Sequence, residues 1–288
     1  MATKNNINTK QNSKKSWEMI VAQHYTYKEA KLWVFILFII SVIIPLSINI
    51  GLIWIKNETI VAIVSFCSII TLIIAELIRN KIAKIKEIAA SIQQLFDISV
   101  FSLKNDFCIN KDEVFAYLRK YKDKDWERKV NWYTVSNNIE HNKAVFYCQK
   151  ENIDWTQSLS KKFKNLLYIL IGLLVVIMIL NFIFINDSII HIISVIITNL
   201  PLLSYVYSGL LKIKNDDKSL GELNKYTLVV EGVLKTTNNI EVYIENLQWM
   251  IFYFRKNKYL IPDWFDKINY RKMQKIEKIK IMTKYKSN

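Results

Sequence analysis

Residues 33–55 read WVFILFIISVIIPLSINIGLIWI, and residues 59–78 read TIVAIVSFCSIITLIIAELI. The first stretch has no charged side chain, and the second has only Glu76, close to its end. At about 1.5 Å per residue, a helix over the first stretch is roughly 34 Å long, which is enough to cross a hydrocarbon core of about 30 Å. A buried helix of a soluble protein would carry charges on one face. Both stretches are therefore predicted to be transmembrane helices.

Residues 166–185 and 189–211 form a second pair of apolar stretches. Within each pair only three residues separate the two stretches, so the two helices are expected to run antiparallel. The predicted fold class is an all-α membrane protein with four transmembrane helices. They are arranged as two hairpins, over residues 33–78 and 166–211.

The formal net charge of +15 is concentrated in the three segments that flank these hairpins. Residues 1–32 carry six basic and two acidic side chains, residues 79–165 carry 17 and 11, and residues 212–288 carry 16 and nine. Lys and Arg are retained on the cytoplasmic side of a membrane. We therefore expect both termini and all three segments to be cytoplasmic.

The polar segments are predicted to be helical, because they are poor in glycine and show helical apolar spacing. Residues 79–165 and 212–288 are expected to pack together as one helical cytoplasmic body, since each has too few apolar residues for a large core. Ser219–Glu222 resembles a capping box at a helix start. The other expected helices are Arg79–Asp97, a helix after an N-cap at Asn110, a tract over 128–163, and Ile240–Arg255. The expected core anchors are Trp132, Trp155 and Trp264.

Catalytic and metal-binding patterns are missing from the sequence. The three histidines, His24, His141 and His191, are far apart and have no second ligand four residues on. There is no GxxxxGK[ST], GxGxxG or GxSxG sequence, and the chain has five glycines in all. We expect no enzyme activity, no metal site and no cofactor.

The fourth apolar stretch carries one stripe of polar or small residues at spacings of three and four, among Ile, Leu and Val. Its members are His191, Ser194, Thr198, Pro201, Tyr205 and Ser208. Such a stripe is unfavourable against lipid, so it should face protein or water. Two interpretations are open: a packing seam inside the four-helix bundle, or a water-lined path that forms when subunits assemble.

The first apolar stretch has a shorter stripe at Ser41, Pro45 and Asn49. Pro45 removes a backbone hydrogen bond and is expected to kink the helix. Together with the longer stripe, Ser41, Asn49 and Glu76 complete the set of candidate pore-lining residues. For Glu76, the alternative to a role in ion selectivity is an interfacial position or a pair with Arg79 or Asn80.

Several short phrases resemble the S-4TM family, the SMODS-associating four-transmembrane effectors, and they occur in the family's order around the apolar stretches. They are Tyr27-Lys28-Glu29-Ala30-Lys31, Ala89-Ala90-Ser91-Ile92-Gln93 through Phe96-Asp97, Asn131-Trp132-Tyr133, Cys148-Gln149-Lys150-Glu151-Asn152-Ile153-Asp154-Trp155, Leu247-Gln248 through Arg255, and Ile261-Pro262-Asp263-Trp264-Phe265.

The resemblance implies a pore-forming effector of a bacterial antiphage system, in the inner (cell) membrane. It would act on a cyclic oligonucleotide made by a cGAS-like nucleotidyltransferase, and would arrest or kill the infected cell. The expected partners are the lipid bilayer, other copies of the chain and that messenger, and no DNA or RNA polymer.

Basic and aromatic side chains of the middle segment are candidate ligand contacts, since guanidinium groups suit phosphate and aromatic rings suit bases. They are Arg119, Lys120, Arg128, Lys129, Trp126 and Trp132. Two further functions remain open: a non-conducting membrane receptor or scaffold that recruits a cytosolic partner, and a constitutive channel or transporter. The constitutive channel or transporter is disfavoured, because the two hairpins show no internal repeat.

Overall fold

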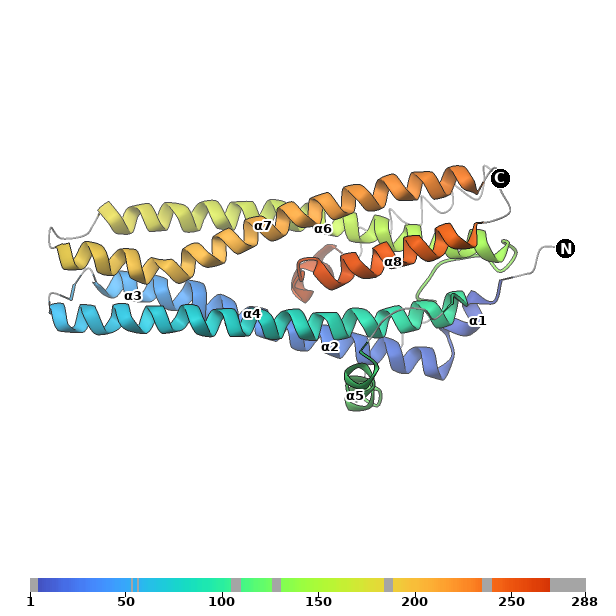
Figure 1. Cartoon of the computed structure of the whole chain (residues 1–288), viewed down its shortest axis with the longest axis horizontal. Helices are drawn as coiled ribbons and strands as arrows, with labels where there is room; N and C mark the ends of the chain where they lie inside the picture. Colours follow the sequence, from blue (N-terminus) through green and yellow to red (C-terminus); the bar gives the residue numbers. More distant parts are fainter. Residues whose placement is uncertain are drawn as a thin grey trace. The chain divides into compact units, whose positions relative to one another are not determined.

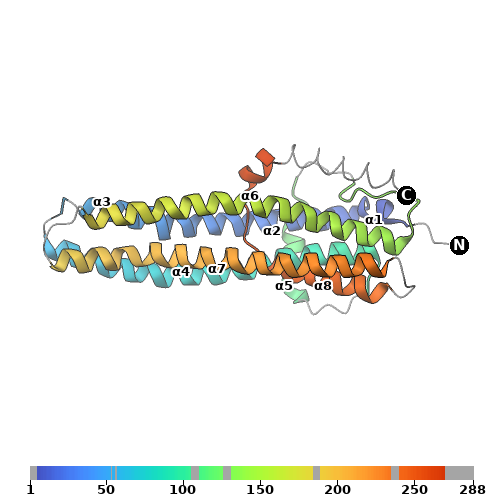
Figure 2. The same cartoon turned by 90° about the horizontal axis from the view of Figure 1, so that it is seen from above.

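The computed structural model describes residues 5–52, 54–55, 57–104, 110–125, 131–183, 189–234 and 240–269 (Figures 1 and 2). The described residues form helices and no extended strand. The helices are α1 (Ile7–Gln11), α2 (Lys14–Phe38), the π-helix η1 (Ile39–Ile43), α3 (Ile44–Leu52), α4 (Glu58–Phe101), α5 (Lys111–Tyr121), α6 (His141–Ile183), α7 (Ile189–Val233) and α8 (Glu241–Asn257). A short helix over 263–269 follows. The predicted all-α fold is confirmed.

Three helical stretches among the described residues are long and apolar enough to cross a membrane: Lys14–Leu52, Glu58–Phe101 and Ile189–Val233. The remaining predicted span, 166–185, lies in α6 up to Ile183 and then leaves the described residues. The count of four spans and their hairpin arrangement stay predictions.

α4 joins an apolar stretch to a polar one without a break. It contains no glycine or proline over its 44 residues, so no residue in it disfavours a continuous helix. The predicted second span, 59–78, and its predicted extension, Arg79–Asp97, are therefore parts of one helix. α4 ends at Ser102, a non-glycine residue with positive φ (57°), and the Leu103 N–H bonds back to the Ile98 carbonyl.

The proline of the first apolar stretch follows a turn of π-helix. Pro45 cannot donate a hydrogen bond to the Ser41 carbonyl, and its ring would crowd that carbonyl in a regular α-helix. The turn Ile39–Ile43 contains Ser41 and is wound more widely than the flanking α2 and α3. The irregularity expected at Pro45 therefore takes the form of a π-turn on its N-terminal side.

The predicted helix start at Ser219–Glu222 is wrong, because these residues lie in the interior of α7. A glycine there disfavours the helix by about 1 kcal/mol relative to alanine. Leu220 and Leu223, on either side of it, are buried in the hydrophobic core. Burying one such side chain stabilises by about 1.5–3 kcal/mol, which outweighs the glycine.

The chain divides into two compact units, and each is described by itself. We call Ala30–Lys84 with Lys162–Asn215 the apolar unit. We call Met1–Glu29, Ile85–Lys161 and Asp216–Asn288 the body. Two small clusters of buried residues hold the apolar unit together. One joins Val42, Leu174, Leu202 and Val206, and the other joins Leu52, Val61 and Val195.

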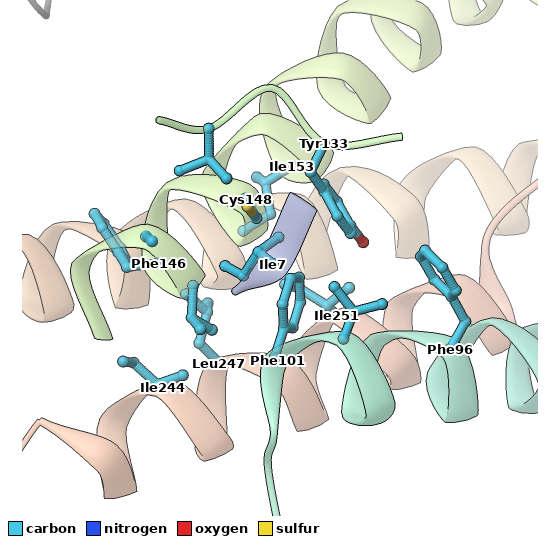
Figure 3. Packing of buried hydrophobic residues seen from close by; sticks show 14 of the residues in the cluster. Ile7, Phe96, Phe101, Tyr133, Phe146, Cys148, Ile153, Ile244, Leu247 and Ile251 are labelled. Atoms are coloured by element: carbon cyan, nitrogen blue, oxygen red, sulfur yellow. The ribbon is translucent and has the colours of Figure 1, made fainter. Parts of the chain in front are cut away.

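The core of the body joins residues from α1, α2, α4, α5, α6, α7 and α8. Phe101 from α4, Phe146 from α6 and Leu247 from α8 are fully buried in it, and Ile7 from α1 lies among them (Figure 3). The sequence analysis assigned core residues to the middle and C-terminal segments only. The N-terminal segment also contributes, because Ile7 buries an apolar side chain within an otherwise polar sequence.

The predicted helical tract over 128–163 begins only at His141. Ahead of it, the backbone of 131–139 is hydrogen-bonded by amide side chains of the N-terminal segment. Gln11 donates to the Tyr133 carbonyl (3.1 Å) and accepts from its N–H (2.7 Å). Asn8 donates to the Val135 carbonyl, and Asn5 donates to that of Ser136. These side chains satisfy backbone groups that would otherwise favour a helix.

The three tryptophans expected as core anchors differ in their surroundings. Trp132 packs edge-to-face on Phe96, with ring centroids 6.2 Å apart. Trp155 is half-buried. Trp264 is 55% exposed in the short helix after α8, so its assignment to the core is wrong.

Gln11→Ala should lower the free energy of unfolding by about 1–3 kcal/mol, because it leaves the buried N–H and carbonyl of Tyr133 without partners. Thermal unfolding of the detergent-purified protein measures this. Asn138→Ala is the matched control, since Asn138 is exposed and lies in the segment that Gln11 binds. Equal stability of the two variants would contradict the role given to Gln11.

Candidate functional site

A buried ion pair lies in the body between α4 and α8. Asp97 from α4 is 0% exposed and Arg255 from α8 is 5% exposed. Arg255 Nη1 lies 2.5 Å from Asp97 Oδ2. The other carboxylate oxygen, Oδ1, accepts a hydrogen bond of 2.5 Å from the hydroxyl of Tyr133. Both oxygens of Asp97 are thus bonded, which is the condition for keeping a carboxylate charged inside a core.

Side-chain amides extend this pair across the body. Gln248 Nε2 donates to Asp97 Oδ2 (3.0 Å) and to Gln94 Oε1 (2.8 Å). Gln149 Nε2 donates to Gln248 Oε1 and to the Ile244 carbonyl, each at 3.0 Å. We call Tyr27, Gln94, Asp97, Tyr133, Gln149, Asn152, Gln248 and Arg255 the buried network. It links α2, α4, α6, α8 and the segment before α6.

The electrostatics of the buried network favour a charged Arg255 and neutral tyrosines. Burial alone would lower the pKa of Arg255, but the charge of Asp97 and its hydrogen bond, together with Tyr133 and Tyr27, outweigh burial and raise that pKa. Burial raises the pKa of Tyr133 well above its usual value, and Asp97 adds to the effect. Burial likewise raises the pKa of Tyr27. Tyr133 therefore acts as a hydrogen-bond donor to Asp97 throughout the physiological range.

Several polar atoms of the buried network have no hydrogen-bond partner among the described residues. They are Arg255 Nη2, Gln94 Nε2, Gln149 Oε1 and the Tyr27 hydroxyl. A buried polar atom without a partner destabilises by about 1–3 kcal/mol. The network thus contains a strong ion pair and several unsatisfied groups in one place.

The buried network also brings together the phrases that carry the family resemblance. Its contributions are Tyr27, Asp97, Tyr133, Gln149 with Asn152, and Gln248 with Arg255, from five of the six phrases. None of these residues was among the sequence-predicted site residues, of which only Trp132 is a chain neighbour of one of them, Tyr133. The sequence did contain a pattern that indicates this site: Gln248 and Arg255 lie on the same helical stripe as the apolar residues Ile244 and Ile251.

Within the apolar unit, the polar stripe of α7 faces the first apolar stretch. Thr198 is 0% exposed, and its hydroxyl donates to Asn49 Oδ1 (2.6 Å). Asn49 Nδ2 in turn donates to Asn199 Oδ1 (3.1 Å). His191 Nε2 lies 2.9 Å from the Ile55 carbonyl. We call Asn49, His191, Thr198 and Asn199 the polar seam.

The other pore-lining candidates lie near this seam or on it. Ser194 and Pro201 are buried, and Tyr205 packs against Phe38 with ring centroids 6.0 Å apart. Ser208 donates to the carbonyl of Tyr205 in its own helix. Ser41 is fully buried, and its hydroxyl has no partner among the described residues. A single chain thus shows the contacts of a packing seam; a water-lined path stays a prediction.

Glu76 pairs with Arg79 at 3.0 Å, as the sequence analysis expected for its alternative role. The guanidinium of Arg79 also donates to the hydroxyl of Ser204 on α7 (3.0 Å). This pair lies at the end of the apolar stretch of α4. A role of Glu76 in ion selectivity stays a prediction.

The basic candidates of the middle segment are only partly described. Arg128, Lys129 and Trp126 lie outside the described residues. Arg119 and Lys120 are in the last turn of α5.

Lys120 is part of a surface group formed by α2 and α5. Its ammonium group lies 3.0 Å from Glu29 Oε2 and 4.7 Å from the ring centroid of Tyr121. Tyr121 stacks on Tyr25, and Lys28 lies over the Tyr25 ring at 5.7 Å. We call Tyr25, Lys28, Tyr117, Lys120 and Tyr121 the tyrosine–lysine cluster. Burial raises the pKa of Glu29, but hydrogen bonds from Tyr121 and Lys120 outweigh it and lower that pKa.

A pocket of about 340 Å³ opens in the body where α4 ends and α6 and α8 begin. Phe101 and Ile244 line its apolar part, and Lys104 and His141 are also in its wall. Glu241 and Glu245 contribute two carboxylates, which oppose the binding of a phosphate. The tyrosine–lysine cluster has two lysines beside one carboxylate, Glu29, which pairs with Lys120, and is therefore the better phosphate site of the two.

Long apolar helices with a polar interior, joined to a helical body, define a helical membrane protein. The chain belongs to the SMODS-associating 4TM effector family, whose sequence model matches residues 5–279. It is also similar to a protein of Bacillus cereus (strain VD146) named as a probable CBASS effector molecule. The two are 28% identical over 299 residues, covering 97% of this chain and 98% of the relative. No solved structure gives a significant match.

Thr198→Val should lower the stability of the protein by about 0.5–2 kcal/mol, because it leaves Asn49 Oδ1 without its donor while keeping the side-chain volume. Thermal unfolding in detergent measures the change. Ile196→Val is the control, since Ile196 is 46% exposed on the same helix. A Thr198→Val variant as stable as the control would show that the hydrogen bond to Asn49 contributes nothing.

Proposed function

We propose that this chain is a membrane effector of a CBASS-type antiphage system. On receiving a cyclic-oligonucleotide signal it forms or gates a pore in the bacterial inner (cell) membrane, and the infected cell is arrested or dies. The family match and the name of the Bacillus cereus relative support the effector role. The proposed role is non-catalytic, because permeabilising a membrane requires no chemical step.

The observation that carries the pore proposal is the polar seam. Asn49, Thr198 and Asn199 are hydrogen-bonded to one another inside a unit whose outer face is Ile, Leu and Phe. Polar side chains in membrane helices are costly and usually mark a pathway or a helix contact. We propose that in the active assembly of several copies the seam opens and its residues line the pore.

The tyrosine–lysine cluster is the proposed place of signal reception. Tyr25, Tyr117 and Tyr121 pack against one another, and Lys28 and Lys120 lie over their rings. A ligand that takes the place of Glu29 beside Lys120 would find aromatic rings suited to bases and cations suited to phosphates. The net charge of +15 attracts an anionic messenger to the chain as a whole. Arg119 lies beside Lys120 on α5 and would add a further cation.

The proposed orientation places both termini and the body in the cytoplasm, where the messenger is made. The distribution of Lys and Arg supports it. A cysteine at the exposed Asn137 should be shielded from a membrane-impermeant thiol reagent in intact spheroplasts, and one at Asn57 should be labelled. Labelling at residue 137 from outside would contradict this orientation.

Purified protein in lipid vesicles should release a trapped dye when cyclic di- and trinucleotides are added. Thr198→Leu should insert normally, because leucine is favoured in the bilayer by roughly 0.3–0.6 kcal/mol, and should block release by filling the seam. Leu203→Ile is the control, since Leu203 is exposed on the same helix. Oligomer size is measured in parallel.

Two results would count against the proposal. Full release by a stably folded Thr198→Leu variant would exclude the seam as the conducting surface. Absence of release from the unaltered protein, with a cytosolic protein captured by the body instead, would favour a non-conducting receptor or scaffold.

A further inference from the structure

α8 buries apolar side chains in the core of the body, among them Ile244, Leu247 and Ile251, and is also joined to α4 by polar contacts. Lys86 of α4 is 3% exposed and donates to the carbonyls of Asn257 and Lys258, each at 3.0 Å. It thereby satisfies the C-terminal end of α8, where a cation is favoured by the helix dipole. One residue further along α4, Glu87 pairs with Lys256. With Asp97–Arg255, three charged contacts join the two helices.

The Asp97–Arg255 pair by itself is a poor source of stability. Removing water from two charges is costly, and apolar residues of similar volume in place of a buried pair are often neutral or stabilising. Arg255 Nη2 and the Gln94, Gln149 and Tyr27 atoms named above are also unsatisfied. A rearrangement of α8 could give those atoms partners, which is a feature of elements that switch between two packed arrangements.

α4 provides a direct connection from this contact to the membrane helices. Lys86, Gln94 and Asp97 lie on the same unbroken helix as the apolar residues 59–78. A change in the contacts between α8 and α4 therefore acts on a helix of the apolar unit, because α4 is continuous. α8 has no such continuity, because it begins at Glu241 and ends at Asn257 within the body.

We propose that α8 is a latch: the Asp97–Arg255 pair and its glutamines hold α8 on α4 in the resting protein, and release of α8 is the step that passes the signal to the apolar helices. This regulation rests on the proposed effector function. In this proposal the buried network controls when the pore opens, in addition to its part in the fold.

The first test needs no messenger. Arg255→Met leaves Asp97 buried without its cation, so amides of α8 should exchange hydrogen at least tenfold faster as one unit, while those of α4 and α7 keep their protection. Lys256→Met, one residue along the same helix at a half-exposed pair, should change little. Equal loss of protection through all body helices, or none in α8, would overturn the latch, whether or not the chain forms a pore.

The second test separates a latch from a merely structural pair. Asp97→Leu/Arg255→Met removes both charges, so it should be folded and at least as stable as the unaltered protein, with α8 held by apolar contacts. Release of dye from vesicles on adding cyclic di- and trinucleotides should fall at least tenfold. A stable double variant that responds normally would overturn the proposal. Failure of the unaltered protein to release dye would contradict the pore function instead, leaving the exchange test to decide on the latch.

Discussion

One interaction organises the body: the carboxylate of Asp97 and the guanidinium of Arg255 are buried together and paired. A buried carboxylate requires hydrogen-bonding partners, and those of Asp97 include Arg255 from α8 and Tyr133 from the segment before α6. Three parts of the chain that are far apart in sequence are therefore fixed at one point. Apolar burial supplies most of the free energy of the core, but the pair and its hydrogen bonds specify which faces of α4 and α8 meet.

The apolar unit shows the same principle without charges. Asn49, Thr198 and Asn199 bond to one another because lipid offers no partner for an amide or a hydroxyl. A seam of this kind is compatible with two functions, since groups that bond across two helices in one state can bond to water in another. This is why a packing contact and a conducting surface can use the same residues at different times.

Sequence patterns predicted the helices of the apolar unit well, because a run such as 59–78 is specified by its local hydrophobicity. They failed where distant contacts decide local structure. The segment ahead of His141 has helical composition, but Gln11 and its neighbours hold its backbone in another conformation. Ser219–Glu222 has the residue types of a helix start, yet the burial of Leu220 and Leu223 keeps α7 continuous.

The candidate sites were predictable to different degrees. The stripe from His191 to Ser208 was visible because it repeats along one helix, and the structure places most of it against protein. The buried network was not foreseen, because Asp97 and Arg255 are 158 residues apart and charged residues are usually read as exposed. The helical stripe Ile244, Gln248, Ile251, Arg255 shows how such a site can be found: polar residues that share an apolar face indicate a buried partner.

The proposed role of the buried network requires Asp97 and Arg255 to act as one unit. A double-mutant cycle with Asp97→Asn and Arg255→Gln, read out by chemical unfolding of the purified protein, measures their coupling directly. Each single variant should be strongly destabilised, and the double variant should recover part of the loss, giving a coupling free energy of about 2–3 kcal/mol. Additive effects of the two substitutions, with no coupling, would contradict a buried pair at this position.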